Sequence, residues 1–176
     1  GDWYLIGLND LIFGSGFSAE AEQWDFLQRH IALAAQRPIA LFMHKPPCVT
    51  SLLEDTDMTH AIPAIARARL RDLMQGANVR LIACGHLHVY RTFQTLGVTV
   101  VVAPPLMRGV DDYLAEHGTN TNGVVHYTFD GEGVAFRLIV PHGVERLPLP
   151  DGPRHTWPTR YPDAQQRRPG TGAARE

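Results

Sequence analysis

Histidines stand at two points of the sequence where short apolar runs end. His44 follows the run Ile39–Met43, and His86 and His88 follow the run Val79–Cys84. The neutral imidazole ring is a common ligand for Zn, Fe, Mn or Cu. The sequence therefore predicts metal-ligating histidines at the ends of two strands.

The residues beside these histidines are suited to holding an imidazole ring in place. Gly85 lacks a Cβ atom, so the chain can turn sharply and expose the ring that follows. Pro46 and Pro47 stiffen the loop that carries His44. A His-x-His pair alone is weak evidence, because residues two apart on any strand point the same way. The block Gly85-His86-Leu87-His88 directly after a buried strand, with His44 upstream, is what favours a metal site.

Three short apolar runs predict the strands that position these loops. Residues 3–8, 39–43 and 79–84 are typical of strands buried on both faces of a sheet. The later sequence predicts two antiparallel hairpins, residues 89–95 with 98–103 and residues 123–129 with 134–140. The fold class is therefore α/β (α+β), with a mixed sheet and antiparallel hairpins at the end. In open sheets of this kind, ligands bind beyond the carboxyl ends of the parallel strands.

Two amphipathic helices are predicted between the first three strands. The first spans residues 18–36 with Ser18 as its N-cap, and the second begins at Pro63 and stops at Gly76. Their apolar stripes are Trp24, Leu27, Ile31 and Ala34 in the first, and Ile62, Ile65, Ala66, Leu70 and Leu73 in the second.

Length and composition exclude several classes of protein. The chain has 176 residues, of which 44% are apolar, so it has room for one domain with a core. A formal net charge of -2 disfavours a dedicated nucleic-acid binder. No apolar run approaches the roughly 18 residues of a membrane span, and a cytoplasmic location is expected. Cys48 and Cys84 cannot form a disulfide scaffold.

The last part of the sequence differs from the rest. Residues 1–147 carry the apolar periodicity, whereas residues 148–176 are rich in Pro and Arg and poor in aliphatic side chains. Such a composition buries too little apolar area to offset the entropy of ordering. The sequence therefore predicts one domain over 1–147 and a flexible tail over 148–176.

Taken together, the motifs resemble the calcineurin-like metallophosphoesterases. The resemblance covers about residues 1–140 and rests on run 39–43 with His44–Pro47, on run 79–84 with Gly85–His88, and on the helix between them. Within that family, the sequence most resembles the branch related to cyclic-nucleotide phosphodiesterases. The resemblance implies a β-sandwich flanked by helices and metal-dependent hydrolysis of small phosphorylated substrates.

The resemblance also implies a dinuclear metal centre of two Fe, Mn or Zn ions. His44 and His86 would ligate one ion, and His88 the other. Three further blocks of the family, Asp-x-His, Gly-Asp-x-x-Asp and Gly-Asn-His-Asp/Glu, do not occur in this sequence. The chain is thus expected to be the C-terminal half of such a hydrolase, with its catalytic residues in the missing half. We expect this fragment to hold at most one weak metal ion, to show little or no activity, and to self-associate through exposed strand edges.

Other interpretations remain open. The chain could be a non-catalytic remnant that binds a partner. A metallo-β-lactamase also uses His-x-His but has an Asp two residues after the second His, where this chain has Tyr90. A cupin would be all strand, and an amidohydrolase barrel needs about 250 residues. His30 is expected at the solvent face of the first helix, and His60 in a solvated loop before the second. Arg91 and Arg108 are expected at the surface.

Overall fold

The computed structural model describes residues 2–55, 60–106, 118–131 and 133–143. The predicted tail, residues 148–176, lies outside this part of the chain. The α-helices are α1 (Ser18–Ala34) and α2 (Ala64–Met74), and a short 3-10 helix, η1 (Asp10–Ile12), follows the first strand. The strands are β1 (Tyr4–Gly7), β2 (Ile39–Phe42), β3 (Val79–Cys84), β4 (Arg91–Thr95), β5 (Val98–Val102), β6 (Val124–Asp130) and β7 (Gly133–Ile139).

Five of these strands form one mixed sheet in the order β1-β2-β3-β5-β4. β1, β2, β3 and β5 are parallel neighbours, whereas β4 is antiparallel to β5. Leu96 and Gly97 make the turn between β4 and β5 with φ angles of 49° and 80°. Two positive φ angles in a two-residue loop match the twist of a hairpin. The sheet and the hairpin β6–β7 confirm the predicted mixed α+β class.

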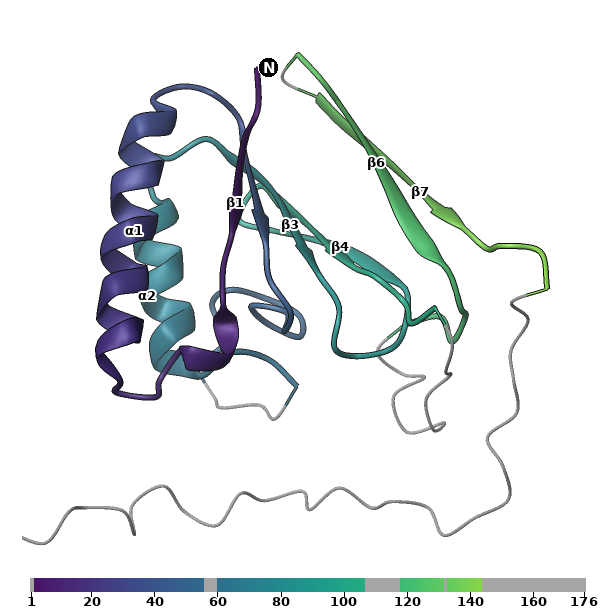
Figure 1. Ribbon diagram of the computed structural model, residues 1–176, viewed down its shortest axis with the longest axis horizontal. Helices are drawn as coiled ribbons and strands as arrows, with labels where there is room; N and C mark the ends of the chain where they lie inside the picture. The colour runs from purple at the N-terminus through teal and green to yellow at the C-terminus, as the bar shows by residue number, and fades with distance from the viewer. Residues whose placement is uncertain (1, 56–59, 107–117, 132, 144–176) are drawn as a thin grey trace, which may run out of the picture.

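The main sheet is covered on both faces, as Figure 1 shows. α1 and α2 lie against one face, and the hairpin β6–β7 lies against the other. On the helix side, Trp24, Leu27 and Leu70 pack with sheet residues such as Leu41 and Ile82, all buried. Burial of such large apolar side chains supplies the main driving force for this layer.

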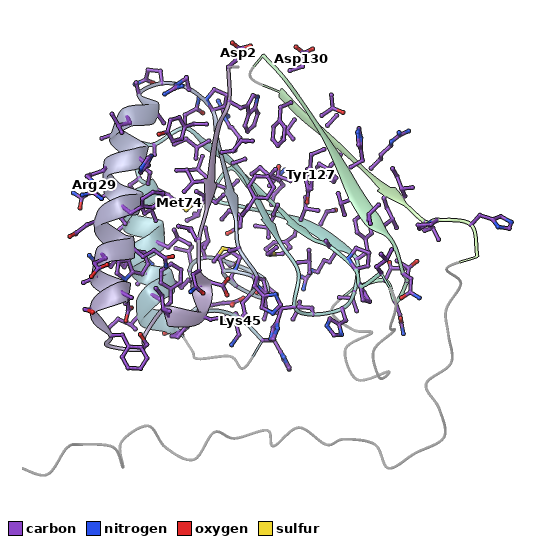
Figure 2. All side chains as sticks on the ribbon, viewed as in Figure 1. Asp2, Arg29, Lys45, Met74, Tyr127 and Asp130 are labelled. Carbon is purple, nitrogen blue, oxygen red and sulfur yellow. The ribbon has the colours of Figure 1, made fainter. Side chains whose placement is uncertain are left out.

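On the hairpin side, the sheet presents the small or branched residues Ala40, Leu81, Ala83 and Val101. Aromatic side chains of the hairpin cover them: Tyr127, Phe129 and Phe136. In Figure 2, Tyr127 lies between the hairpin and the main sheet. Burial is the first cause that raises the pKa of its hydroxyl above the ordinary value. The large aromatic rings fill the space that the small sheet residues leave.

Two details of the helices differ from the sequence predictions. The N-cap of α1 is Phe17 rather than Ser18, and it makes no side-chain cap hydrogen bond. Glu20 instead reaches back to accept the N–H groups of Gly14 (2.7 Å) and Gly16 (2.9 Å). Ile65 was expected in the stripe of α2 but is 77% exposed, because the buried side of that helix follows Ala66, Leu70 and Met74. Among the described residues, no helix has the length and apolar content that crossing a membrane requires.

Candidate functional site

The carboxyl ends of β2 and β3 bring His44 and His86 together. The two strands are parallel neighbours, so the loops that follow them leave the sheet at the same edge. His44 Nε2 and His86 Nδ1 lie 3.1 Å apart, and the two ring centroids are 4.9 Å apart. Two residues that the sequence singled out, 42 positions apart, thus form one imidazole pair.

The backbone of the His44 loop is held by a buried carboxylate. Asp10 follows β1 and is only 2% exposed. Its Oδ1 accepts the N–H of His44 at 2.5 Å, and its Oδ2 accepts the N–H of Lys45 at 2.9 Å. In Figure 2, Lys45 lies at the end of the sheet where these strands terminate. Sequence reasoning missed this role of Asp10, because a lone acid after a strand carries no distinctive spacing.

The loop after β3 is held by backbone hydrogen bonds, one to the His44 loop and one within itself. Gly85 donates its N–H to the carbonyl of His44 at 2.9 Å, and Leu87 donates its N–H to the carbonyl of Gly85 at 2.8 Å. His86 and His88 both have left-handed backbone conformations, with φ angles of 67° and 54°. Between them, Leu87 is 1% exposed and belongs to the core on the helix side. The alternation buries the leucine and places His86 half-buried and His88 exposed.

A further imidazole, His60, lies beside this pair. Its ring centroid is 6.4 Å from that of His86. The N–H of Ile62 donates to the carbonyl of Pro46 at 3.1 Å. This bond holds the residues just before α2 against the loop that carries His44. His60 was expected only as a solvated loop residue, since its proximity to His86 depends on this path of the chain and not on any spacing in the sequence.

The loop between β2 and α2 is shaped by one buried arginine and one glutamate. Arg67 is fully buried and donates to the carbonyls of Glu54 (2.9 Å), Ile62 (3.2 Å) and Pro47 (3.4 Å). The Glu54 carboxylate accepts backbone N–H groups from Val49, Thr50 and Ser51. Burial opposes the charged form of Glu54, but the hydrogen bond from the Thr50 hydroxyl, together with these backbone bonds, outweighs it and lowers the pKa of Glu54.

The surroundings keep the His86 ring neutral at neutral pH. Burial is the largest cause, followed by the electrostatic effects of His44, Lys45, His60 and His88, and together they lower the pKa of His86 to about 4. A neutral imidazole has a free lone pair, which is the form that binds a metal ion. The electrostatics of the site are therefore compatible with ligation.

The imidazole pair fits one metal ion only in part. Zinc binds imidazole nitrogen at about 2.0–2.1 Å in tetrahedral geometry, which places two such nitrogens about 3.3 Å apart. The 3.1 Å between His44 and His86 is close to that value. Across the described residues, however, no group of three or more His, Cys, Asp or Glu side chains is arranged to hold a metal. Two donors fit, and the other ligands have to come from elsewhere.

Cys48 and Cys84 are not part of this site. Both are buried members of the core, and burial raises the pKa of the Cys48 thiol to about 12 and raises that of Cys84 as well. Buried neutral thiols are poor metal ligands. Cys84 packs in the core from β3, and Cys48 is fully buried although it lies in the loop that follows β2.

The remaining residues considered in the sequence analysis lie apart from the imidazole pair or outside the described residues. His30 Nδ1 hydrogen-bonds to the hydroxyl of Tyr4 at 2.6 Å. Arg91 stacks over the ring of Phe93 at 4.8 Å. Arg108 lies outside the described residues. An open depression on the outer face of α1, where Figure 2 labels Arg29, lies away from the histidines.

Comparison with known proteins gives one similar sequence and a similar fold. A curated protein named probable cyclic nucleotide phosphodiesterase, from Rhodococcus erythropolis, is 32% identical over 83 residues. That match covers 46% of this chain and 26% of the relative, so the chain spans about a quarter of the relative's length. No family model matches the chain.

Among solved structures, GAP50, described as the anchor in the inner membrane complex of Plasmodium, superimposes with a TM-score of 0.50 at 13% identity. The match covers 61% of this chain and 34% of that one, and it indicates a shared fold. A dimetal phosphatase from Danio rerio gives a TM-score of 0.36 at 15% identity over 47% of this chain and 26% of that one. A score this low carries no argument. The sequence relative points to a phosphoesterase-like relationship, and the match to GAP50 shows the fold alone.

Proposed function

We propose that this chain is the histidine-bearing, C-terminal part of a metallophosphoesterase that hydrolyses phosphate esters. The observation that supports this most directly is the meeting of His44 and His86 at 3.1 Å, at the carboxyl edge of a mixed sheet. The 83-residue similarity to a protein named as a cyclic nucleotide phosphodiesterase adds independent support. A phosphodiester is accordingly the substrate class we favour.

In this proposal His44 and His86 ligate one divalent ion, and His88 ligates a second. Such a pair of ions, when bound, supplies an activated water and stabilises charge on the phosphate oxygens. The chain's own contribution is orientation: it presents imidazole nitrogens from the ends of two neighbouring strands. Fe, Mn and Zn all accept imidazole ligands, and the residues present do not choose among them.

The same proposal limits what the chain can do alone. Two cations about 3.5–4 Å apart repel strongly, and bridging carboxylates normally offset the repulsion. Asp10 is a buried carboxylate that contacts the backbone of His44. Each of its two oxygens already accepts a backbone N–H group. The carboxylate ligands would therefore be supplied by a preceding segment. By itself, the chain should hold one ion weakly.

Titration calorimetry with Zn²⁺ and Mn²⁺ tests the proposal. Wild-type chain should bind one ion weakly, and His44→Ala and His86→Ala should each abolish that binding. His126→Ala, at an exposed position on β6, is the matched control and should bind as wild type does. Two tight sites per chain, or binding that survives both variants, would contradict the proposal.

Activity is tested on the protein extended by its upstream coding sequence. With Mn²⁺ or Zn²⁺ present, hydrolysis of bis(p-nitrophenyl) phosphate should exceed that of p-nitrophenyl phosphate, because we favour a diester substrate. His86→Ala should remove the activity. Equal rates for the two compounds would leave hydrolysis standing and remove the diester preference.

A second candidate is a non-catalytic scaffold with the same fold. The observation that favours it is the lack of any three-residue metal-binding group within the described ranges. If the upstream sequence lacks the three missing carboxylate and histidine blocks, and the extended protein does not hydrolyse either phosphate compound, the scaffold interpretation replaces the hydrolase.

A further inference from the structure

Asp10 occupies an unusual position for an acidic side chain. It lies at the start of η1, is 2% exposed, and borders the edge of the sheet where the histidines gather. Burying a carboxylate is unfavourable unless hydrogen bonds compensate for the lost water. Within the described part of the chain, Asp10 obtains that compensation from two backbone groups, the N–H groups of His44 and Lys45.

These bonds complete the anchoring of His44 from both sides. The last sheet-like bond of this segment runs from the N–H of Met43 to the carbonyl of Ala83 at 3.0 Å. The N–H of His44 donates to the Asp10 carboxylate, and the carbonyl of His44 accepts the N–H of Gly85 at 2.9 Å. The backbone of His44 is thus held by residues that follow β1 on one side and β3 on the other.

We infer that Asp10 is a positioning residue for the metal site: it sets the direction of the His44 side chain so that its Nε2 meets the Nδ1 of His86. This inference rests on the proposed function. In this inference Asp10 acts through the backbone of His44 and Lys45 and not as a ligand itself. Ligand groups have to be held within about 0.5 Å of their productive geometry. Groups that orient ligands typically change metal affinity by about 10- to 100-fold when they are removed.

The test compares Asp10→Asn with a remote variant of similar stability cost. Asp10→Asn keeps the size of the side chain but turns one acceptor into an NH₂ group that faces a backbone N–H. Ile39→Val, at the opposite end of β2, also perturbs the core but leaves this edge intact. We expect Zn²⁺ affinity about 10- to 100-fold weaker in Asp10→Asn, and unchanged within about twofold in Ile39→Val. Bound Co²⁺ should show an altered visible spectrum only in the Asp10 variant.

A second readout needs no metal. In the metal-free chain, NMR should show contact between the His44 and His86 rings, together with slow exchange of the His44 and Lys45 amides. Both signals should be lost in Asp10→Asn and kept in Ile39→Val. Asp10→Ser, which retains one acceptor without an added amide, takes the place of Asp10→Asn if that variant does not fold.

The outcomes separate this inference from the proposed function. If His44→Ala and His86→Ala abolish Zn²⁺ binding while Asp10→Asn leaves affinity and ring contact unchanged, the positioning role is wrong and the proposed site stands. Equal losses in Asp10→Asn and Ile39→Val would also overturn it, since they would reflect stability alone. If wild-type chain binds no Zn²⁺, the proposed function fails for this chain, and the ring contact and amide exchange still decide the role of Asp10.

Discussion

The two histidine loops reach the same edge of the sheet by different means. The first loop, described over residues 43–55 and 60–63, has its backbone held by three side chains: Asp10 and Arg67 from outside the loop, and Glu54 from within it. The second loop, residues 85–88, is held by one backbone bond within the loop, by one to the carbonyl of His44, and by the burial of Leu87. Long loops need external partners for their polar groups, whereas a four-residue loop can be fixed by local conformation and one apolar anchor.

The largest expected effect is on the first loop, through its arginine. Arg67→Leu removes the donor to three carbonyl groups, two of them in buried bonds. Each buried polar group left without a partner costs about 1–3 kcal/mol, so the free energy of unfolding should fall by at least about 3 kcal/mol. Chemical denaturation measures this. Arg29→Leu, at an exposed position on α1, is the control and should cost less than about 1 kcal/mol. Equal losses would mean that the loop does not depend on the buried guanidinium.

The second loop should depend on its apolar anchor. Leu87→Ala leaves a cavity in the core and should lower the free energy of unfolding by about 2–3 kcal/mol. Leu53→Ala removes the same atoms from a side chain that is 61% exposed and should cost little. The ring contact between His44 and His86 should weaken in the first variant, as seen by NMR. If Leu87→Ala is neutral, the second loop is not held as described.

The backbone conformation of His88 predicts a smaller effect of opposite sign, in which a substitution raises the free energy of unfolding. His88 has a φ angle of 54°, a region that glycine enters at less cost than other residues. His88→Gly should therefore raise the free energy of unfolding by up to about 1 kcal/mol, measured by thermal and chemical denaturation. The same change at His126, in the extended strand β6, should lower it by about 0.5–1 kcal/mol. Two changes of the same sign would count against a locally strained second loop.

The smallest expected effect is a pH dependence of the free energy of unfolding, which arises from Glu54 in the first loop. The pKa of Glu54 is lower in the folded chain than its ordinary value of 4.5. Its contribution to stability is therefore present above that ordinary value and is lost as the pH falls through the lower, folded value. Denaturation of Glu54→Gln at a series of pH values should show a shallower loss in acid than wild type. Glu22→Gln, exposed on α1, serves as the control and should follow the wild-type curve.

The comparison also shows which features sequence reasoning can reach. The apolar runs 39–43 and 79–84 predict two buried parallel strands, and parallel strands end at one edge, so the meeting of His44 and His86 could be expected. The positions of Asp10 and His60 could not, because they depend on the irregular paths that follow β1 and precede α2. Ile65 was placed in the wrong stripe, since a helix of 11 residues fits more than one apolar face.

Zinc K-edge X-ray absorption on the zinc-loaded chain is the most direct test of the central claim. The account predicts two imidazole nitrogens at about 2.0 Å in the wild-type chain, and no retained zinc in His44→Ala or His86→Ala. A zinc spectrum without imidazole scattering, or one that neither variant changes, would contradict a metal site built from these two strand ends.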